Sequence, residues 1–424
     1  MPLLNGEERV IGLLELASPV AYGINAFLEL RFRAIVALFR TALARSREEV
    51  DNRLEAILRE HYTSLHPSVE WRFLQSAYRL LENQEPAEST PEPVAFKHVY
   101  PLYGQADIVN SSTLRNAAIY ADLRENLLLA KNTLEKALLQ LDYPLAHQGL
   151  RSIEAALNIK QDDFNNSNET SAAELLLNNI HPILRQFADD VPALEAPIAH
   201  YFSRLDPDLM LIYHRRRDYE QSVSRLNTEL SHFFLSRDRK SQNYLAHYFE
   251  SYQTDGVEYQ LYAGQSLLQK KCFSEIHLRN LRLAQLIDLC DATRLVAQLQ
   301  SQLPHPLTTA QLAFAYTSPL NINFRMDEKR FDVEGAYNIR YEILKKRIDK
   351  ATINQGQERL TKPEHLSIIY LHDKDQQEYL GYCHYLQTEG YLTDELEEFF
   401  LDPMQGVQGL RAIRAKVKSL HPLA

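Results

Sequence analysis

The amino-acid sequence predicts a mostly α-helical protein that ends in an α+β domain. Apolar residues recur at three- and four-residue spacing over most of residues 21–300, which is the period of amphipathic helices. Short apolar runs separated by turn residues replace that pattern after residue 305, which indicates strands mixed with helices. A length of 424 residues gives room for two or three domains, each with its own core.

Composition and charge argue against several classes of protein. A hydrophobic content of 45% and a charged content of 24% are ordinary for a globular chain. The formal net charge of −10 argues against a general nucleic-acid-binding protein, because neutralising phosphates needs a basic face. Cys272, Cys290 and Cys383 are far apart and odd in number, which suits a reducing compartment and gives no zinc-site spacing.

Neither a signal peptide nor a membrane span is expected near the N-terminus. The opening MPLLNGEERV carries charge where a signal peptide would begin its apolar run. The most apolar stretch, residues 22–44, is interrupted by charged residues that a spanning helix would not tolerate, namely Glu29, Arg31, Arg33 and Arg40. We therefore expect a cytoplasmic protein without membrane association.

Residues 1–20 are predicted to form a strand or hairpin. ERVIGLLELASP is an apolar run that follows the turn signal Asn5-Gly6 and ends at Ser18-Pro19. An isolated hairpin is not stable in water. It must therefore pack on the rest of this chain or on a part that the chain lacks.

Residues 21–84 are expected to form a long helix followed by a shorter one. The long helix is amphipathic from Ala21 to about Tyr62, with apolar side chains on one face and Arg, Glu and Asp on the other. HPSVEWRF (66–73) begins the second helix, with a proline near its first turn, where proline is tolerated.

A linker and a helical domain are predicted to follow. ENQEPAESTPEP (82–93) is rich in Pro, Glu and Ser and has no apolar anchor, so we assign residues 85–98 to a linker. Residues 99–305 are then predicted to be mostly helical. Within them TDGVEYQLYAG (254–264) has an Asp-Gly turn signal and an alternating pattern that suggest a short strand.

Residues 306–424 are predicted to form a compact α+β domain with the order β-β-α-β-α-β-β. Two strands near 312–326 precede a helix at 336–351, and a strand, a helix and two further strands complete the order. In the last strand, LRAIRAKVK (410–418), apolar residues alternate with cationic ones. Such cationic alternation is typical of an edge strand, because it discourages pairing with another chain.

The stretch VYPLYGQADIVNSSTLRN (99–116) allows two interpretations. As structure, residues 100–104 form an aromatic-walled turn and one of the two serines caps the helix that follows, with the acid near the positive helix end. As function, serine hydroxyls, free helix amides and an arginine make an anion pocket. The candidate ligand-binding residues are Asp107, Ser111, Ser112, Arg115 and Asn116. Capping chemistry explains most of this stretch, but it does not require all of these residues together.

Two further segments are rich in charged residues. HYFESYQTDGVEYQLYAGQS (247–266) holds the candidates Asp255 and Glu258 near a histidine, a set that suits acid–base chemistry, a hard metal, or a packed helix end with its turn. Residues 325–350 hold eight basic and six acidic residues, as in a salt-bridged face or a phosphate patch. The candidates there are Arg325, Asp327, Lys329, Arg330 and Asp332.

Recognisable catalytic and nucleotide-binding motifs do not occur in the sequence. It contains no His-Glu-x-x-His, no nucleophile elbow and no Gly-rich phosphate loop. His61, His66 and Glu70 could meet on successive helical turns, but Pro67 interrupts the helix register. The sequence therefore leads us to expect no metal, no cofactor and no catalytic set.

Several phrases resemble a known group of proteins. ERVIGLLELASP followed by a long helix resembles the last core strand and exit helix of a GAF domain, a small sensory module. Other phrases are similar to those of largely uncharacterised bacterial GAF-domain-containing proteins; they are HPSVEWRF, VYPLYGQADIVNSSTLRN, HYFESYQTDGVEYQLYAGQS, MDEKRFDVEGAYNIRYEILKKRIDKA and ERLTKP. In that family a GAF-like region precedes the opening strand. The resemblance implies that this chain is a C-terminal portion or truncated relative, with residues 1–20 as a remnant of the sensor.

Three functions stay open at this point. The first is a non-enzymatic cytoplasmic signalling or regulatory region associated with a GAF-like sensor. The second is a small-molecule or anion-binding protein, or an enzyme, whose pocket forms where residues 104–116, 254–266 and 325–340 meet. The third is a helical scaffold that binds a protein partner or dimerises through the helix at 22–62. Whether the three polar segments share one concave cleft discriminates the second function from the others.

Overall fold

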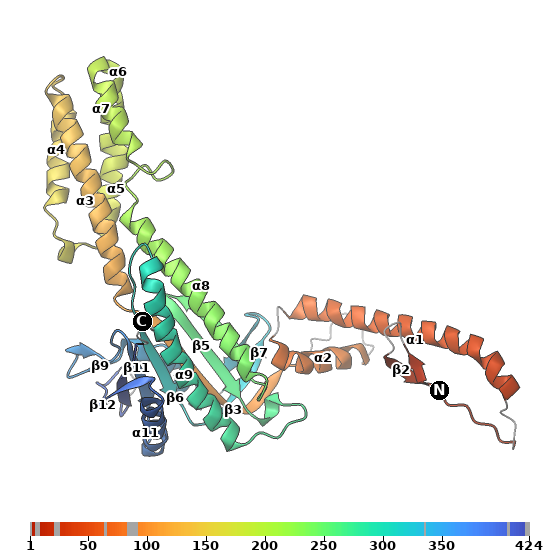
Figure 1. Cartoon of the computed structure of the whole chain (residues 1–424). Coiled ribbons are helices and arrows are strands. Elements are labelled where there is room, and N and C mark those ends of the chain that lie inside the picture. Colours follow the sequence, from red (N-terminus) through yellow and green to blue (C-terminus); the bar gives the residue numbers. More distant parts are fainter. Residues whose placement is uncertain are drawn as a thin grey trace, which may run out of the picture.

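The computed structural model of the chain describes residues 2–4, 9–20, 26–62, 66–82, 92–334, 336–404 and 408–419. A large sheet lies at the centre, a helical arm extends from one end of it, and a second arm carries the N-terminus (Figure 1). The predicted fold class is confirmed, since helices predominate and the C-terminal part mixes strands with helices. Within the described residues, no helix combines the length and the apolar character needed to cross a lipid bilayer.

The described α-helices fall into the two arms and the layers that cover the sheet. They are α1 (Ala26–His61), α2 (Pro67–Glu82), α3 (Ser111–Leu138), α4 (Pro144–Leu157), α5 (Asn166–Glu174), α6 (His181–Asp190), α7 (Pro192–Ser203), α8 (Arg215–Ser241), α9 (Glu275–Leu299), α10 (Ala336–Lys345) and α11 (Asp373–Thr388). A π-helical turn, Leu175–Ile180, joins α5 to α6.

Local sequence accounts for several helix starts. The Asn165 side chain accepts hydrogen bonds from the backbone amides of Ser167 and Asn168 at the start of α5. At α9, Ser274 and His277 form a reciprocal capping box. Proline occupies the first turn of α4 and α7, where its missing N–H costs no hydrogen bond.

The described strands form one large sheet and two small hairpins. They are β1 (Pro2–Leu4), β2 (Val10–Leu13), β3 (Ala95–Ile108), β4 (Tyr248–Thr254), β5 (Gly256–Ala263), β6 (Thr309–Ala315), β7 (Leu320–Arg325), β8 (Arg330–Val333), β9 (Thr352–Ile353), β10 (Glu358–Arg359), β11 (His365–Tyr370), β12 (Leu392–Phe400) and β13 (Arg411–Val417). The large sheet has the order β12-β13-β11-β6-β3-β5-β4, and β7 and β8 extend it from the first half of β3. The β11–β6 pair is parallel, whereas its other pairs are antiparallel.

The centre of the sheet is β3, which the sequence did not predict. Residues 95–98, assigned to a linker, begin this strand, and residues 100–104, interpreted as a turn, continue it between β5 and β6. Pro101 and Gly104 suggested a turn because both usually interrupt strands. Gly104 has a packing role instead: a Cβ there would lie 2.5 Å from the Tyr259 ring on β5.

The sheet unites two stretches of chain that the sequence suggested as separate domains. Strands β3, β4 and β5 come from residues 99–305 or just before them, and they join strands from residues 306–424. Helices α8 and α9 pack side by side on one face, together with α11. The other face is covered by α2, by β7 and β8, and by α10. A third core lies within the arm formed by α3 to α7.

The last strand is not at the edge of the sheet. We predicted an edge for residues 410–418, but β13 lies between β12 and β11. Its cationic side chains are accommodated by ion pairs: Arg414 is almost fully buried and pairs with Glu397 at 2.7 Å and Glu358 at 3.0 Å. The charge alternation therefore serves internal pairing, and the edge prediction was wrong.

Candidate functional site

Two of the three polar segments meet in one cleft. A cleft of about 540 Å³ opens between the β4–β5 hairpin, β8 and α10. Glu258 from the 254–266 segment lines it together with Arg330 and Asp332 from the 325–340 segment. Its other charged residues are Glu250, which belongs to the 247–266 segment, and three that were not candidates, Glu342, Lys345 and Lys346.

A hydrogen-bond network forms the inner wall of this cleft. Glu250 accepts hydrogen bonds from Tyr248, at 2.8 Å, and from Gln260. Gln260 in turn accepts a hydrogen bond from Lys345 Nζ at 2.9 Å, which connects β4 through β5 to α10. Burial raises the pKa of Glu250, although hydrogen bonds from Tyr248 and Tyr252 and the nearby Lys345 charge act in the opposite direction. The wall is therefore a connected polar layer on one face of the sheet.

Glu258 connects the cleft to the central strand. Its Oε2 accepts a hydrogen bond from Tyr103 Oη at 2.9 Å, and the same hydroxyl lies 3.4 Å from Gln105. Burial is the main reason that the pKa of Tyr103 is raised, and the adjacent Glu258 charge raises it further. Within the described chain Tyr103 is the only hydrogen-bond donor to the Glu258 side chain, so the other carboxylate oxygen, Oε1, has no donor there. The segment at 104–116 thus reaches the site through Gln105, just behind the cleft wall.

The rim of the cleft carries cations in different states of pairing. Arg330 is paired with Glu328, and Lys345 lies 3.3 Å from Glu342. Lys346 is exposed and forms no ion pair with any described residue. Among the described residues, the Lys346 ammonium at the mouth of the cleft is therefore available for a ligand.

The remaining candidates from 325–340 form a hairpin turn. Arg325 pairs with Asp327 at 3.0 Å and with Asp332 at 3.3 Å. Lys329 is in the turn with a positive φ of 51°. These exposed pairs act locally between β7 and β8, and from this group only Arg330 and Asp332 line the cleft.

Asp107, Ser111 and Asp255 lie together where β3 ends. Asp107 is opposite Gly256 in the β3–β5 register, and Ser111 Oγ donates to Asp255 Oδ2 at 2.8 Å. Burial, with the charge of Asp349 adding to it, raises the pKa of Asp107 to about 6. The capping prediction fails here, because α3 begins at Ser111 after a left-handed Asn110, with no side-chain cap.

The other candidates of this stretch do not join that cluster. Ser112 is exposed, and no described residue forms a side-chain hydrogen bond with Ser112 or with Asn116. Arg115 lies close enough to α8 to lower the pKa of Glu220, whose pKa is also lowered by hydrogen bonds from Tyr213 and Arg216, effects that together outweigh burial. Arg115 therefore faces α8, whereas Asp107 faces the opposite side of the sheet, near Asp349 and Arg359.

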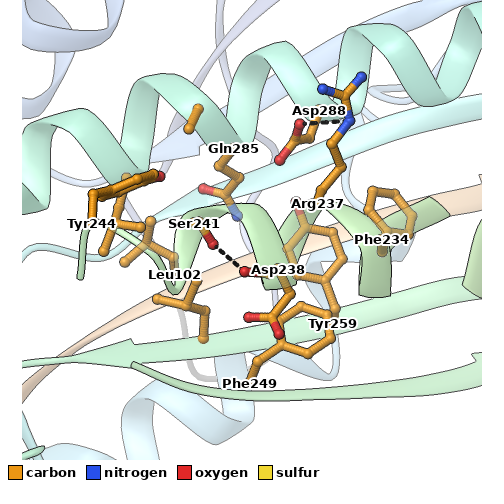
Figure 2. A pocket seen from close by; sticks show the side chains of 13 residues that line it. Leu102, Phe234, Arg237, Asp238, Ser241, Tyr244, Phe249, Tyr259, Gln285 and Asp288 are labelled. Carbon is orange, nitrogen blue, oxygen red and sulfur yellow. Dashed lines mark hydrogen bonds and ion pairs between the residues drawn. The ribbon is translucent and has the colours of Figure 1, made fainter. Parts of the chain in front are cut away.

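A second polar cluster, which the sequence analysis missed, lies between α8, α9 and the sheet. Figure 2 shows Arg237, Asp238 and Ser241 from α8 beside Gln285 and Asp288 from α9, over the ring of Tyr259. The cavity among them is about 30 Å³, which is room for a water molecule or two and no more. Its size limits it to a structural role or to small ions.

Asp238 contacts a buried histidine in that cluster. The two ring nitrogens of the fully buried His247 each face an acceptor: Nδ1 lies 2.8 Å from Leu245 O, and Nε2 lies 2.9 Å from Asp238 Oδ1. Both ring nitrogens are therefore within hydrogen-bonding distance of an oxygen atom. Burial alone would raise the pKa of Asp238, but hydrogen bonds from His247, His66 and Gln242 outweigh it and hold the pKa below its usual range.

Arg237 is shared by two carboxylates at the same cluster. Its guanidinium lies 2.6 Å from Asp291 and 3.3 Å from Asp288. Burial raises the pKa of Asp288 to about 7, and the charge of Arg237 only partly offsets this. Among the described residues, no group of three or more His, Cys, Asp and Glu side chains is arranged to hold a metal ion.

Comparison with known proteins adds little. No protein-family model matches the chain, and no curated protein matches its sequence. Among solved structures, the chain is similar to the guanylyl cyclase Cya2, with a TM-score of 0.27 and 12% sequence identity, over 48% of this chain and 84% of that chain. A TM-score that low bears on neither fold nor function.

Proposed function

We propose that this protein is a regulatory protein that binds a small charged molecule in the cleft between the β4–β5 hairpin, β8 and α10. The observation that carries the proposal is a row of polar side chains that lies beside an apolar core on the same face of the sheet. The row crosses three neighbouring strands and consists of Gln105, Glu258, Gln260 and Glu250.

If folding were its only role, this row of polar side chains would be unfavourable. Removing carboxylates from water costs free energy unless donors replace the lost water, and an apolar face would need none. Tyr62, Phe73 and Phe331 in the neighbouring core illustrate that apolar alternative. Sites where local stability is sacrificed are often binding sites. The polar row borders an open cleft, which supports ligand binding over a purely structural role.

The free groups indicate the kind of ligand. Glu258 has an oxygen with no donor in the described chain, and Lys346 has no ion-pair partner there. A molecule with a cationic group for Glu258 and an anionic group for Lys346 would complement both. The proposed ligand class is therefore a small zwitterion, such as an amino acid or a related amine with a carboxylate or phosphate.

Regulation rather than catalysis is proposed because the Glu250 side chain in the cleft wall is already hydrogen-bonded. Glu250 is held by tyrosine and glutamine donors, so it is poorly placed to take a proton from a substrate. The association with a GAF-like sensor belongs to the same proposal and rests on the sequence resemblance, and the cytoplasmic setting rests on the charged, signal-free pattern of the N-terminal sequence.

The test is a thermal-shift and calorimetric screen of amino acids, polyamines and nucleoside monophosphates. A zwitterion is expected to bind and to raise the melting temperature, and Glu258→Gln is expected to weaken its binding about tenfold or more. Glu275→Gln, on the exposed start of α9, is the matched control and should bind normally. Binding that Glu258→Gln leaves unchanged, or no binding by any zwitterion, would overturn the proposal. Turnover of a bound compound would instead support an enzyme.

A further inference from the structure

Helix α1 carries apolar side chains at 35–50 that the described part of the chain leaves exposed. At 36 residues it is about 54 Å long, and Figure 1 shows it extending away from the central sheet. Its C-terminal end is anchored, since Leu54 and Tyr62 are buried. Further along, Leu38 is 72% exposed and Phe39 is 50% exposed. A free-standing helix with this composition is unusual, because apolar side chains normally provide the packing that stabilises helices.

The exposed residues lie in a stripe. Ile35, Phe39, Leu43 and Val50 are separated by four, four and seven positions, which places them on one side of the helix. The β1–β2 hairpin covers only part of α1. A Cβ at Gly12 would lie 2.9 Å from Leu43 Cδ2, so the hairpin packs closely there. The rest of the stripe has no cover in the described part of the chain.

Charge divides the same helix into two halves. Residues 35–47 contain Arg40, Arg45 and Arg47 and no acidic residue, a net charge of +3. Residues 48–59 contain four acidic residues and two arginines, a net charge of −2. Both of those arginines are already paired within the helix, Arg53 with Glu49 and Arg59 with Glu55. In contrast, Arg40, Arg45 and Arg47 form no ion pair with any described residue.

We propose that α1 forms an antiparallel pair with α1 of a second copy of this chain. A two-fold axis near the boundary between Arg47 and Glu48 would place each basic half against the acidic half of the other copy. The same axis brings Leu43 of one copy close to Val50 of the other, so the two apolar stripes overlap near the axis. A parallel pair would set like charges side by side, which is unfavourable. This self-complementarity is the reason to choose a second copy over an unrelated partner.

Sedimentation of the full chain over a hundredfold concentration range tests for self-association. A monomer–dimer equilibrium that weakens as salt rises is expected, because the charge pairs are screened. Phe39→Glu should shift the dissociation constant by at least about tenfold. Leu139→Glu is the control: Leu139 is 86% exposed between α3 and α4, so this variant should dimerise normally. A wild-type chain that stays monomeric throughout would overturn the proposal, as would a dimer that Phe39→Glu does not weaken.

Exchanging the charges in the two halves of α1 tests the electrostatic part of the proposed pairing. The variant R40E/R45E/R47E and the variant E48R/E49R/D51R are each expected to be monomeric, because each places like charges together in a homodimer. Mixed in equal amounts, the two should form a heterodimer. Circular dichroism confirms that each variant is folded before mixing. Failure of the mixture to associate would contradict the pairing.

Cysteine cross-linking tests the orientation. In a Cys272→Ser background, which removes the exposed native thiol, Leu43→Cys and Val50→Cys chains are mixed and oxidised. An antiparallel pair should cross-link the two different variants more efficiently than either variant with itself. Preferential cross-linking of identical variants would indicate a parallel pair and would overturn the proposal.

Discussion

The hydroxyl of Tyr103 on β3 donates a hydrogen bond to Glu258 on β5 over 2.9 Å. In the β3–β5 register Tyr103 is opposite Gln260 and Gln105 is opposite Glu258, so this contact runs diagonally between neighbouring strands. It ties the wall of the candidate cleft to the strand at the centre of the sheet. A change in the charge of Glu258 therefore alters a hydrogen bond made by the buried Tyr103.

Removing this donor should reduce stability. Tyr103→Phe leaves the Glu258 carboxylate without its protein donor, and we expect the free energy of unfolding to fall by about 1–2 kcal/mol. Urea denaturation followed by circular dichroism measures the change. Tyr385→Phe, at an exposed position on α11, is the control and should be near neutral. Equal effects of the two substitutions would argue against a buried hydrogen bond at Tyr103.

Asp107 should make stability depend on pH. Its pKa is raised from 3.8 to about 6 in the fold, so folding favours the protonated carboxyl. The wild-type protein should therefore lose stability as pH rises from about 4 to about 6. Asp107→Asn avoids this loss and should be more stable than the wild type by about 1–3 kcal/mol at pH 7, with the advantage vanishing near pH 4. The exposed Asp394→Asn should give no such pH-dependent difference. If the free energies of unfolding of the wild type and of Asp107→Asn changed with pH in the same way, the raised pKa of Asp107 would be refuted.

The stability contributed by Asp238, which contacts the buried His247, should depend on pH in the opposite direction to that of Asp107. The pKa of Asp238 is held below its usual range, so its contribution is present above about pH 4 and is lost as pH falls further. Asp238→Asn leaves the His247 ring without its carboxylate, and we expect a loss of roughly 3–5 kcal/mol at neutral pH. The difference in free energy of unfolding between Asp238→Asn and the wild type should become smaller in acid. Denaturation curves measured from pH 7 down to about pH 3 follow this narrowing.

Gly256 should tolerate no side chain. Its φ is +132°, and a Cβ would lie 2.1 Å from Ala106 O, against the backbone of the central strand. Gly256→Ala should cost more than about 3 kcal/mol or prevent folding. Gly356 also has a positive φ, +82°, but open space around it, so Gly356→Ala should cost only about 1 kcal/mol. Comparing soluble yield and melting temperature of the two variants separates the steric effect from backbone strain.

Local periodicity was sufficient for the helices and for most of the C-terminal strands. The helix predicted from Ala21 to about Tyr62 corresponds to α1, and the strand predicted between the two helices of the C-terminal domain corresponds to β11. In contrast, β3 was missed because its identity as a strand depends on partners far away in the chain. The pairs Asp107–Gly256 and Asp107–Ala310 have no local signal. The hydrophobic pattern alone therefore identifies mainly those elements whose stabilising contacts are close together in the chain.

The same reason explains how much of the candidate site was found. Glu258, Arg330 and Asp332 stood out because each lies in a visibly charged segment. Glu250 and Lys345 became part of the site only through a glutamine that lies between them in space. The cluster of Asp238, His247 and His66 also escaped notice, because it joins three separate parts of the chain.

The path of the chain through β3 sets an order for folding. The chain leaves the sheet at Ile108 and returns to it at Tyr248, and the helical arm with its own core lies between those points. Helical contacts within the arm are local and form quickly, whereas pairing of residue 107 with residue 310 must close a very long loop. The arm can therefore form before β3 meets β6, and we expect closing that loop to be the slow step in forming the native sheet.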